Sequence, residues 1–240
     1  MSDVDLRDIA AMRGGSRNLR GYLVKPSSAA PWPGLVMIHE AFGLDAVMRR
    51  QAERLAAAGY LTLAVDLFSA GGAVRCLVST MRALMTGHGR AFADIEAARE
   101  WLLQSPECTD RIGVIGFCMG GGFALLAAGS GFEVASVNYG SLPRDLDAAA
   151  AAACPIVASY GARDRTLRNA ASKLEESLTK AGVVHDVKEY PTAGHAFLND
   201  AETGPRVLRP LLRVAGVGPD PAAAADAWHR IEDFFAQHLR

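Results

Sequence analysis

The sequence has almost no net charge and no long apolar run. Its 25 basic and 26 acidic residues are interspersed and leave a formal charge of −1. This balance offers no electrostatic footprint for nucleic acid or for an anionic membrane. No stretch reaches the roughly 18 uncharged apolar residues of a membrane span, and Met1–Asp8 is acidic and lacks the apolar core of a signal peptide. We therefore expect a cytoplasmic protein that binds neither nucleic acid nor membrane.

Cysteine is also scarce. The chain has four, at Cys76, Cys108, Cys118 and Cys154, with no C-x-x-C spacing and no histidine pairs at metal-ligand intervals. Neither a zinc site nor a disulfide framework is indicated. Cys76, Cys108 and Cys154 are most simply core or incidental residues, and Cys118 stands apart because of its neighbours.

What the chain does have is a regular alternation of apolar strands and amphipathic helices, with 50% hydrophobic residues over 240 positions. The patterns predict strands at 19–24, 34–40, 60–66, 111–115, 134–140, 155–159 and 183–190, and helices at 46–58, 90–104, 120–128, 148–153, 167–181 and 221–238. Such alternation predicts one α/β domain over residues 1–240, with a mostly parallel sheet flanked by helices on both faces. Two segments, 69–89 and 201–219, are harder to place, and we expect them to shape a pocket as loops do on a rigid scaffold.

The most informative motif is Gly116-Phe117-Cys118-Met119-Gly120. It joins a buried strand to a glycine-opened helix, which is the context of the G-x-S-x-G motif with cysteine in place of serine. In that strand-turn-helix the central residue has a strained backbone and its side chain is exposed for attack. The alternative is a small, buried and inert cysteine.

Two later residues favour the catalytic interpretation. Asp164 and His195 each follow a predicted strand, so the order nucleophile, acid, histidine is that of the α/β-hydrolases. His195 would take the thiol proton, and Asp164 would hold the imidazole and stabilise the imidazolium. The N-terminus of the helix after Cys118 would favour thiolate. The backbone N–H of Met119 would supply one oxyanion donor, and the loop after the strand ending at His39 would supply the other.

Glu40 closes an apolar strand at the same edge as Cys118. A carboxylate at such a place is costly unless it is paired or useful, so Glu40 is a candidate site residue. A helix-dipole or surface role is the alternative. His39 is interpreted as a strand-end packing residue.

The chain resembles the dienelactone hydrolase family over roughly residues 17 to 200 and the closing helix. The resemblance rests on His39–Gly43, Gly116–Gly121, Asp164 and Gly194–Phe197. It implies an α/β-hydrolase fold and a carboxylic ester hydrolase that opens an unsaturated lactone, dienelactone, to maleylacetate without metal or organic cofactor. It further implies that Cys118, Asp164 and His195 form the triad, that Glu40 contacts the resting thiol and takes part in its activation, and that the amides of Ala41 and Met119 form the oxyanion hole.

The residues that would bind substrate depart from the family pattern. Ala196 and Asn199 stand where the family has serine and arginine, and a second family arginine is matched only by Arg75, at an uncertain alignment. We expect the substrate-binding residues to be Phe42, Arg75, Phe197 and Asn199. Because arginine is the residue suited to bidentate carboxylate binding, we expect substrates recognised through a carboxylate to be handled poorly.

Two other functions remain open. One is an esterase or thioesterase of the same family that acts on an uncharged acyl substrate. The other is a non-catalytic binding or redox-sensing homologue in which Cys118 is oxidised rather than acylated. In each hydrolase interpretation the partner is a small ester or lactone, and we expect a monomer or a weak homodimer.

Overall fold

A computed structural model describes all 240 residues, and its centre is one eight-stranded sheet in the order β1-β2-β4-β3-β5-β6-β7-β8. The strands are β1 (Ser2–Asp5), β2 (Arg20–Val24), β3 (Trp32–Ile38), β4 (Leu61–Asp66), β5 (Cys108–Phe117), β6 (Ala135–Asn138), β7 (Ile156–Gly161) and β8 (His185–Tyr190). Strand β2 pairs antiparallel with both β1 and β4. All other neighbouring strands, from β4 to β8, are parallel. The predicted mostly parallel α/β architecture is therefore confirmed.

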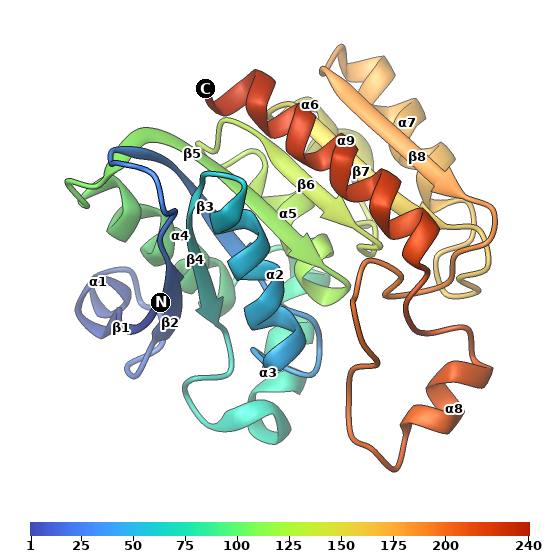
Figure 1. Cartoon of the computed structure of the whole chain (residues 1–240), viewed down its shortest axis with the longest axis horizontal. Helices are drawn as coiled ribbons and strands as arrows, with labels where there is room; N and C mark the ends of the chain where they lie inside the picture. The colour runs from blue at the N-terminus through green and yellow to red at the C-terminus, as the bar shows by residue number, and fades with distance from the viewer.

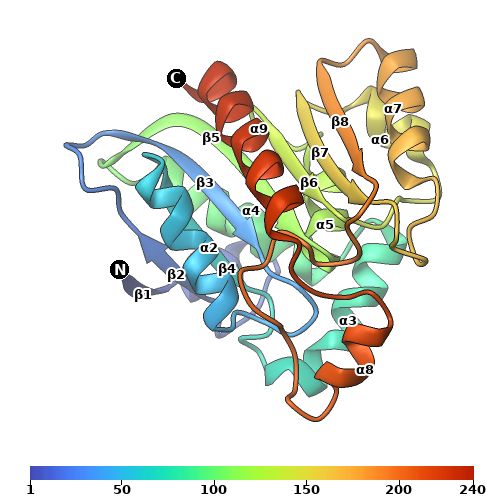
Figure 2. The same cartoon turned by 45° about the vertical axis from the view of Figure 1, so that its right-hand side comes forward.

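Helices cover both faces of the sheet (Figures 1 and 2). They are α1 (Arg7–Met12), α2 (Ala46–Ala57), α3 (Gly72–Thr86), α4 (Arg90–Leu103), α5 (Met119–Ala127), α6 (Leu146–Ala151), α7 (Ala170–Ala181), α8 (Arg209–Val214) and α9 (Pro221–Leu239). Helices α2 and α9 pack with one apolar cluster, and α1 and α3 to α7 pack with the other. None of the helices combines the length and the apolar character needed to cross a membrane.

Each central strand contributes side chains to both clusters. In β3, Val36 and Ile38 face one cluster while Leu35 and Met37 face the other, and all four are fully buried. Successive strand residues point to opposite faces, so a strand covered on both sides is apolar throughout. This is why the run from 34 onwards is apolar without alternation.

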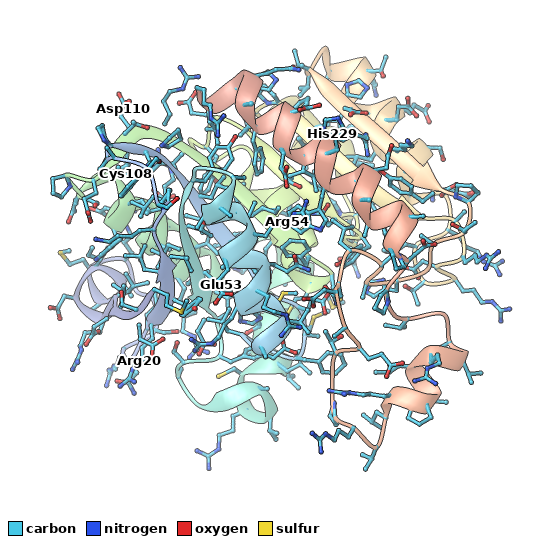
Figure 3. The ribbon with its side chains drawn as sticks, in the orientation of Figure 1. Arg20, Glu53, Arg54, Cys108, Asp110 and His229 are labelled. Carbon is cyan, nitrogen blue, oxygen red and sulfur yellow. The ribbon has the colours of Figure 1, made fainter.

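On the outer face, α2 and α9 lie side by side and are tied by Arg54. Its guanidinium lies over the Trp228 ring, 4.7 Å from the centroid, and its Nε donates to Glu232 at 3.0 Å. Figure 3 shows Arg54 between the two helices, with His229 on the outward side of α9. The contact fixes α9 over the centre of the sheet, where Trp228 and Phe235 fill the core.

Three parts of the chain differ from the sequence predictions. Most of the segment 69–89 is the helix α3, which buries Cys76, Thr80, Ala83 and Leu84. The segment 201–219 contains the short helix α8, which buries none of its residues and projects beyond the sheet (Figures 1 and 2). The short elements β1 and α1 were not predicted at all.

Candidate active site

The turn between β5 and α5 places Cys118 at the carboxyl edge of the sheet. Its φ is +56°, a conformation that costs a non-glycine residue free energy. The two flanking glycines permit the turn: a Cβ on Gly116 would lie 1.9 Å from the Gly120 carbonyl oxygen, and a Cβ on Gly120 would lie 2.2 Å from that of Ile38. The Cys118 N–H donates to the Asn138 carbonyl at 3.0 Å, which fastens the turn to the neighbouring strand.

The side chain of Asp164 lies against His195. His195 Nδ1 and Asp164 Oδ2 are 2.5 Å apart, and Asp164 Oδ1 accepts hydrogen bonds from the N–H and hydroxyl of Thr166 at 2.9 and 2.6 Å. Burial alone would raise the pKa of Asp164, but the hydrogen bonds from His195 and Thr166 outweigh burial and hold it below its ordinary value. The carboxylate therefore stays ionised without any arginine.

His195 faces Cys118 on its other side. Burial alone would lower the pKa of His195, but the hydrogen bond to Asp164 and the neighbouring Cys118 sulfur outweigh burial and raise it to about 10. The arrangement therefore favours an imidazolium beside the Cys118 sulfur at neutral pH.

The backbone of His195 is clamped by the segment that returns from α8. His195 N–H donates to the Gly216 carbonyl at 3.0 Å, and the Gly218 N–H donates to the His195 carbonyl at 2.9 Å. A Cβ on Gly194 would lie only 1.8 Å from the Gly216 oxygen, so the close approach requires glycine. Ala196 is also left-handed, at φ +60°, which completes the sharp turn that presents the imidazole.

Glu40 is almost fully buried behind the site, with 3% of its surface exposed. Its Oε1 accepts hydrogen bonds from the Tyr139 hydroxyl at 3.3 Å and from Asn199 Nδ2 at 3.1 Å. Burial raises the pKa of Glu40, and the positive charge of His195 and the two donors lower it in part. No hydrogen bond connects Glu40 to Cys118, and the thiol contact expected from the resemblance stays a prediction.

Tyr139 is the site residue that the sequence did not reveal. It has a left-handed φ of +40°, is fully buried, and its ring lies 5.1 Å from that of His195. In the sequence it is one more aromatic residue at the end of an apolar strand. Only the Tyr139-Gly140 pair at the end of β6 hinted at a turn toward the site.

The expected oxyanion donors lie on adjacent strand ends. Met119 opens α5, and Ala41 follows Glu40 just after β3. Because β3 and β5 are neighbours and Gly120 lies against the carbonyl of Ile38, the two loops meet at the same edge. His39 packs under them: its Nε2 accepts from the Leu67 N–H at 3.1 Å and its Nδ1 lies 2.7 Å from the Glu40 carbonyl oxygen, as expected of a strand-end packing residue.

The four expected substrate-binding residues do not come together. Phe197 is fully buried and packs on Tyr139 and Tyr190, with centroids 5.6 and 5.1 Å away, so it supports the site from within the core and is not placed to touch substrate. Asn199 is used by Glu40. Arg75 is exposed on α3 and makes no hydrogen bond or ion pair with the other candidates. Phe42 lines a cavity, and its role in substrate binding stays a prediction.

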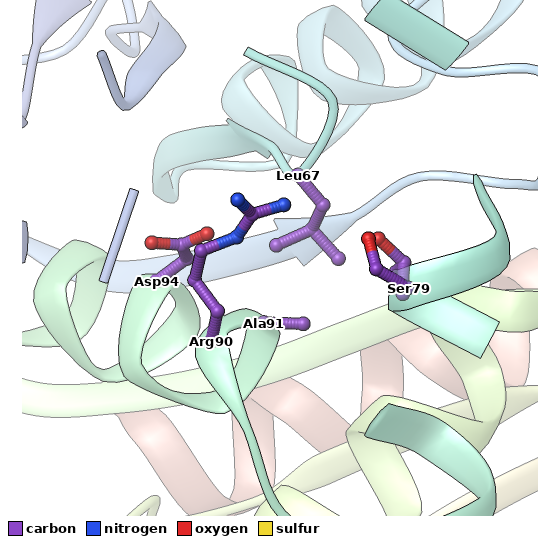
Figure 4. Close-up of a pocket in the computed structure, with 6 residues that line it drawn as sticks. Leu67, Ser79, Arg90, Ala91 and Asp94 are labelled. Atoms are coloured by element: carbon purple, nitrogen blue, oxygen red, sulfur yellow. The ribbon is translucent and has the colours of Figure 1, made fainter. Parts of the chain in front are cut away.

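Two cavities adjoin the site and share no residue. The first, of about 660 Å³, lies between the loop after β3, α2, α3 and residues 201–209, and it is mostly apolar, with Phe42, Val47 and Leu77 among its walls. The second, of about 990 Å³, is lined by residues 161–169, Glu189, His195 and residues 214–217. A third space beside Asp94 holds only about 30 Å³, close to the volume of one water (Figure 4). The Asp94 carboxylate accepts two hydrogen bonds of 2.6 Å from Ser16, one from the backbone N–H and one from the hydroxyl.

The remaining cysteines lie away from the site. Burial raises the pKa of the Cys108 thiol to about 11 and that of Cys154 to about 12, and Cys76 is buried under α3. Figure 3 shows Cys108 near Asp110 at the start of β5, the end opposite to Cys118. All three are free thiols, and Cys108 and Cys154 are partly buried.

The parallel sheet and the strained residue between a central strand and its helix define an α/β-hydrolase. Residues 19–239 match the model of the Dienelactone hydrolase family, and the chain belongs to this family. A relative from Methylorubrum extorquens, with the provisional name carboxymethylenebutenolidase, is 28% identical over 90% of this chain and 76% of its own length. The carboxymethylenebutenolidase of Rhodococcus opacus is 27% identical over 91% of this chain and 86% of its own length. Among solved structures, a dienelactone hydrolase-like promiscuous phosphotriesterase from metagenomic libraries has the same fold, with a TM-score of 0.80, 24% identity and 95% coverage of both chains.

Proposed function

We propose that this chain hydrolyses a carboxylic ester or lactone through Cys118, His195 and Asp164. The observation that carries the proposal is the left-handed Cys118 facing a histidine whose other nitrogen lies 2.5 Å from a buried aspartate. A structural cysteine needs neither the strained backbone nor the histidine. The strain has a reason only if the sulfur must be presented.

Acylation would start from a Cys118 thiolate beside the His195 imidazolium, in which the thiol proton already lies on Nε2. The thiolate adds to the acyl carbon, and the N–H groups of Met119 and Ala41 donate to the resulting oxyanion. When the tetrahedral intermediate collapses, the carbon–oxygen bond to the leaving group breaks and the imidazolium gives its proton to the departing oxygen. The products of this half-reaction are an alcohol and a Cys118 thioester, or a single thioester that carries the alcohol when the substrate is a lactone.

Deacylation would repeat the cycle with water. Neutral His195 removes a proton from water as its oxygen adds to the thioester carbon, and collapse expels the Cys118 thiolate beside the imidazolium. The carboxylic acid leaves and the resting enzyme returns. Asp164 holds the imidazole in place through both halves and keeps its own charge, and neither half requires a metal or an organic cofactor.

The substrate-binding residues favour an uncharged acyl group, which makes a neutral esterase or thioesterase the second candidate. Asn199 is committed to Glu40, Ala196 carries no polar atom, and Arg75 faces solvent. In the apolar cavity Arg50 is already paired with Asp200 at 2.5 and 2.7 Å. Arg209 also lines this cavity, where it donates to the Gly204 carbonyl at 3.2 Å and pairs with no acid, so it is the one cation of the cavity left to meet an acyl carboxylate. Phe42 offers an apolar wall beside it.

Pre-steady-state hydrolysis of p-nitrophenyl propionate tests the proposal. We expect a burst of p-nitrophenol equal to the enzyme concentration, and loss of both burst and turnover in Cys118→Ala. A residual kcat/KM above about one hundredth of the wild type, a loss below about 3 kcal/mol, would contradict the nucleophile assignment. Absence of a burst with formation of a Cys118 sulfenic acid under peroxide would support the redox-sensing alternative.

A further inference from the structure

We propose that helix α3 and residues 205–215 together form a docking surface for an anionic lipid surface. We call these two segments the basic apolar face. The inference goes beyond the proposed hydrolysis, because docking on lipid requires no reaction at Cys118.

The basic apolar face exposes most of the large apolar side chains found on the protein surface. Of the twelve large hydrophobic residues that are exposed, seven lie on it: Val74, Val78, Met85, Val207, Leu208, Leu211 and Val214. Val74 is 94% exposed and Val214 is 88% exposed. Single exposed apolar residues are ordinary, but a concentration of them marks an interaction surface.

On α3 these side chains form one stripe. Val74, Val78 and Met85 are spaced by four and seven residues, so they share the side of the helix opposite to its buried residues. Arg75 and Arg82, also seven residues apart, run along the edge of the stripe. An apolar stripe with a basic edge is typical of a helix that lies in a lipid interface.

The basic apolar face carries positive charge only. It contains five arginines and none of the 26 acidic residues of the chain; the arginines are Arg75, Arg82, Arg206, Arg209 and Arg213. One of them, Arg213, is paired with an acid, Glu202, from outside the face. The formal charge of −1, from which no membrane partner is expected, therefore averages over a local basic excess, and such an excess is attracted to anionic lipid.

The second segment of the face gains little burial from the fold. Residues 201–215 make hydrogen bonds and ion pairs only with one another, as in Arg213 with Glu202 and Arg209 with the Gly204 carbonyl. Helix α8 buries none of its residues. Insertion of its apolar side chains among lipid acyl chains would remove them from water, which is favourable.

The charge of the face excludes a second copy of this chain as its occupant. In a symmetric dimer the same patch meets itself. Five arginines would then face five arginines, and such a juxtaposition of like charges is costly. The occupant must therefore be anionic.

The apolar cavity favours lipid over an acidic protein. Val74, Leu77, Pro205 and Arg209 belong to the basic apolar face and also line the cavity of about 660 Å³ that Ala41 of the expected oxyanion loop lines. Both segments lie in the lower part of Figures 1 and 2. A docked lipid surface would lie over this cavity and offer acyl chains to it, whereas a docked protein would cover it.

Co-sedimentation with vesicles tests the inference. Vesicles of equal parts phosphatidylglycerol and phosphatidylcholine are anionic, and vesicles of phosphatidylcholine alone are the neutral control. At low ionic strength we expect the wild type to partition onto the anionic vesicles about thirtyfold or more strongly than onto the neutral ones, and we expect about 0.5 M salt to remove most of this preference. Cys118→Ala should bind as the wild type does, so the result does not depend on ester hydrolysis.

Arg75→Gln/Arg206→Gln tests the charge of the face. It removes one exposed arginine from each segment, and neither arginine makes a hydrogen bond or ion pair. We expect the preference for anionic vesicles to fall about tenfold. Arg17→Gln/Arg144→Gln makes the same change in net charge at exposed, unpaired arginines outside the face and should keep the wild-type preference.

Val78→Ser/Leu211→Ser tests the apolar component at constant charge. These side chains are 76% and 69% exposed, so the melting temperature should stay near that of the wild type. We expect binding to the anionic vesicles to weaken about tenfold. Val184→Ser, at a residue that is 58% exposed and outside the face, should bind as the wild type does.

Equal partitioning of the wild type onto anionic and neutral vesicles would overturn the inference, as would a preference that survives both double substitutions. Binding to immobilised polyglutamate without binding to vesicles would make an acidic polypeptide the partner instead. A dimer in analytical ultracentrifugation that Val78→Ser/Leu211→Ser dissociates, again without vesicle binding, would make a second copy the occupant. Each of these results would leave the proposed hydrolysis through Cys118 standing.

Discussion

Asn199 donates its side-chain amide to Glu40 across 3.1 Å, and both residues are 97% removed from solvent. The Tyr139 hydroxyl completes the set of donors to the same carboxylate oxygen. The three side chains form a polar layer directly behind Cys118 and His195. Because Asn199 is held in this layer, it cannot also bind a substrate carboxylate.

We expect Glu40→Gln to lower turnover by about tenfold or more while changing the free energy of unfolding by less than about 1 kcal/mol. Burial raises the pKa of the Glu40 carboxyl because a buried charge destabilises the fold. The neutral glutamine removes this destabilisation, and it also removes the negative charge near His195. The measurements are ester turnover, urea unfolding, and the pH profile of Cys118 alkylation by iodoacetamide, which should move by more than half a pH unit.

Tyr139→Phe is the matched control for this experiment. It removes a donor to Glu40 and leaves the charge in place, so its alkylation profile should move less than that of Glu40→Gln. Superimposable profiles for Glu40→Gln and the wild type would assign Glu40 a purely structural role.

Gly116→Ala should destabilise the protein by about 3 kcal/mol or more, because the added Cβ meets backbone atoms that cannot move without opening the turn. Gly122→Ala, in the helix α5 that follows the turn, should cost less than about 1 kcal/mol. Its Cβ meets the side chains of Ser141 and Leu84, and alanine is the better helix former. Urea unfolding of the two variants compares them, and equal losses would contradict the proposed strain at Cys118.

The His195 imidazole should titrate near pH 10 in the wild type, so that its protonated form persists through neutral pH and declines only above that value. In Asp164→Asn the largest remaining influence is burial, which disfavours the charged form, so the pKa should fall clearly toward its ordinary 6.5. NMR titration of the histidine ring signals measures both, and the alkaline limb of turnover should move to lower pH in the variant.

His39 serves as an internal reference in that titration. Burial lowers its pKa, and its ring is fixed between the Leu67 amide and the Glu40 carbonyl. Its signals should not respond to Asp164→Asn. A His195 pKa that is the same in both proteins would show that Asp164 does not stabilise the imidazolium.

Phe42→Ala should change which acyl chains are preferred. Phe42 is 36% exposed, lines the apolar cavity, and lies under Gly204, where an added Cβ would be 2.8 Å from its ring. We expect kcat/KM for p-nitrophenyl hexanoate, relative to the acetate, to change by about threefold or more, since each buried methylene contributes about 0.8 kcal/mol.

Val78→Ala and Arg75→Ala are the controls for the acyl-chain series. Both residues are exposed on α3 and line no cavity described above, so neither should alter the ratio. Assay of dienelactone beside the neutral esters completes the series. If dienelactone is by far the best substrate and Arg75→Ala leaves it so, the carboxylate is held by residues other than those considered.

The strand ends could be predicted from sequence because each ends in a recognisable break, and the triad residues follow those breaks. Helix α3 could not. Its buried positions Cys76, Thr80, Ala83 and Leu84 have helical spacing, but Val74, Val78 and Met85 are apolar and exposed on the other face and hide the period. Helix α8 buries nothing, so its sequence carries no amphipathic signal.

Residues close to a motif in sequence are not all exposed at the site. Phe197 lies two positions after His195, but the left-handed Ala196 turns the chain and sends the ring into the core. Tyr139 has no motif at all and acquires its role from a neighbouring strand. Contacts between strand ends depend on sheet order, which the sequence does not specify.

Hydrogen bonds join His195 to Gly216 and Gly218, so residues 200–215 form a loop that leaves the fold just after His195 and returns to it at His195. A loop that is anchored at both ends can be exchanged as a unit, and we call residues 200–215 the cassette. Its closing cost rises only slowly with length, so insertions or replacements within it need not shift the imidazole. Both cavities draw part of their walls from this cassette, and substitution there offers a route to new substrate preference on an unaltered catalytic core.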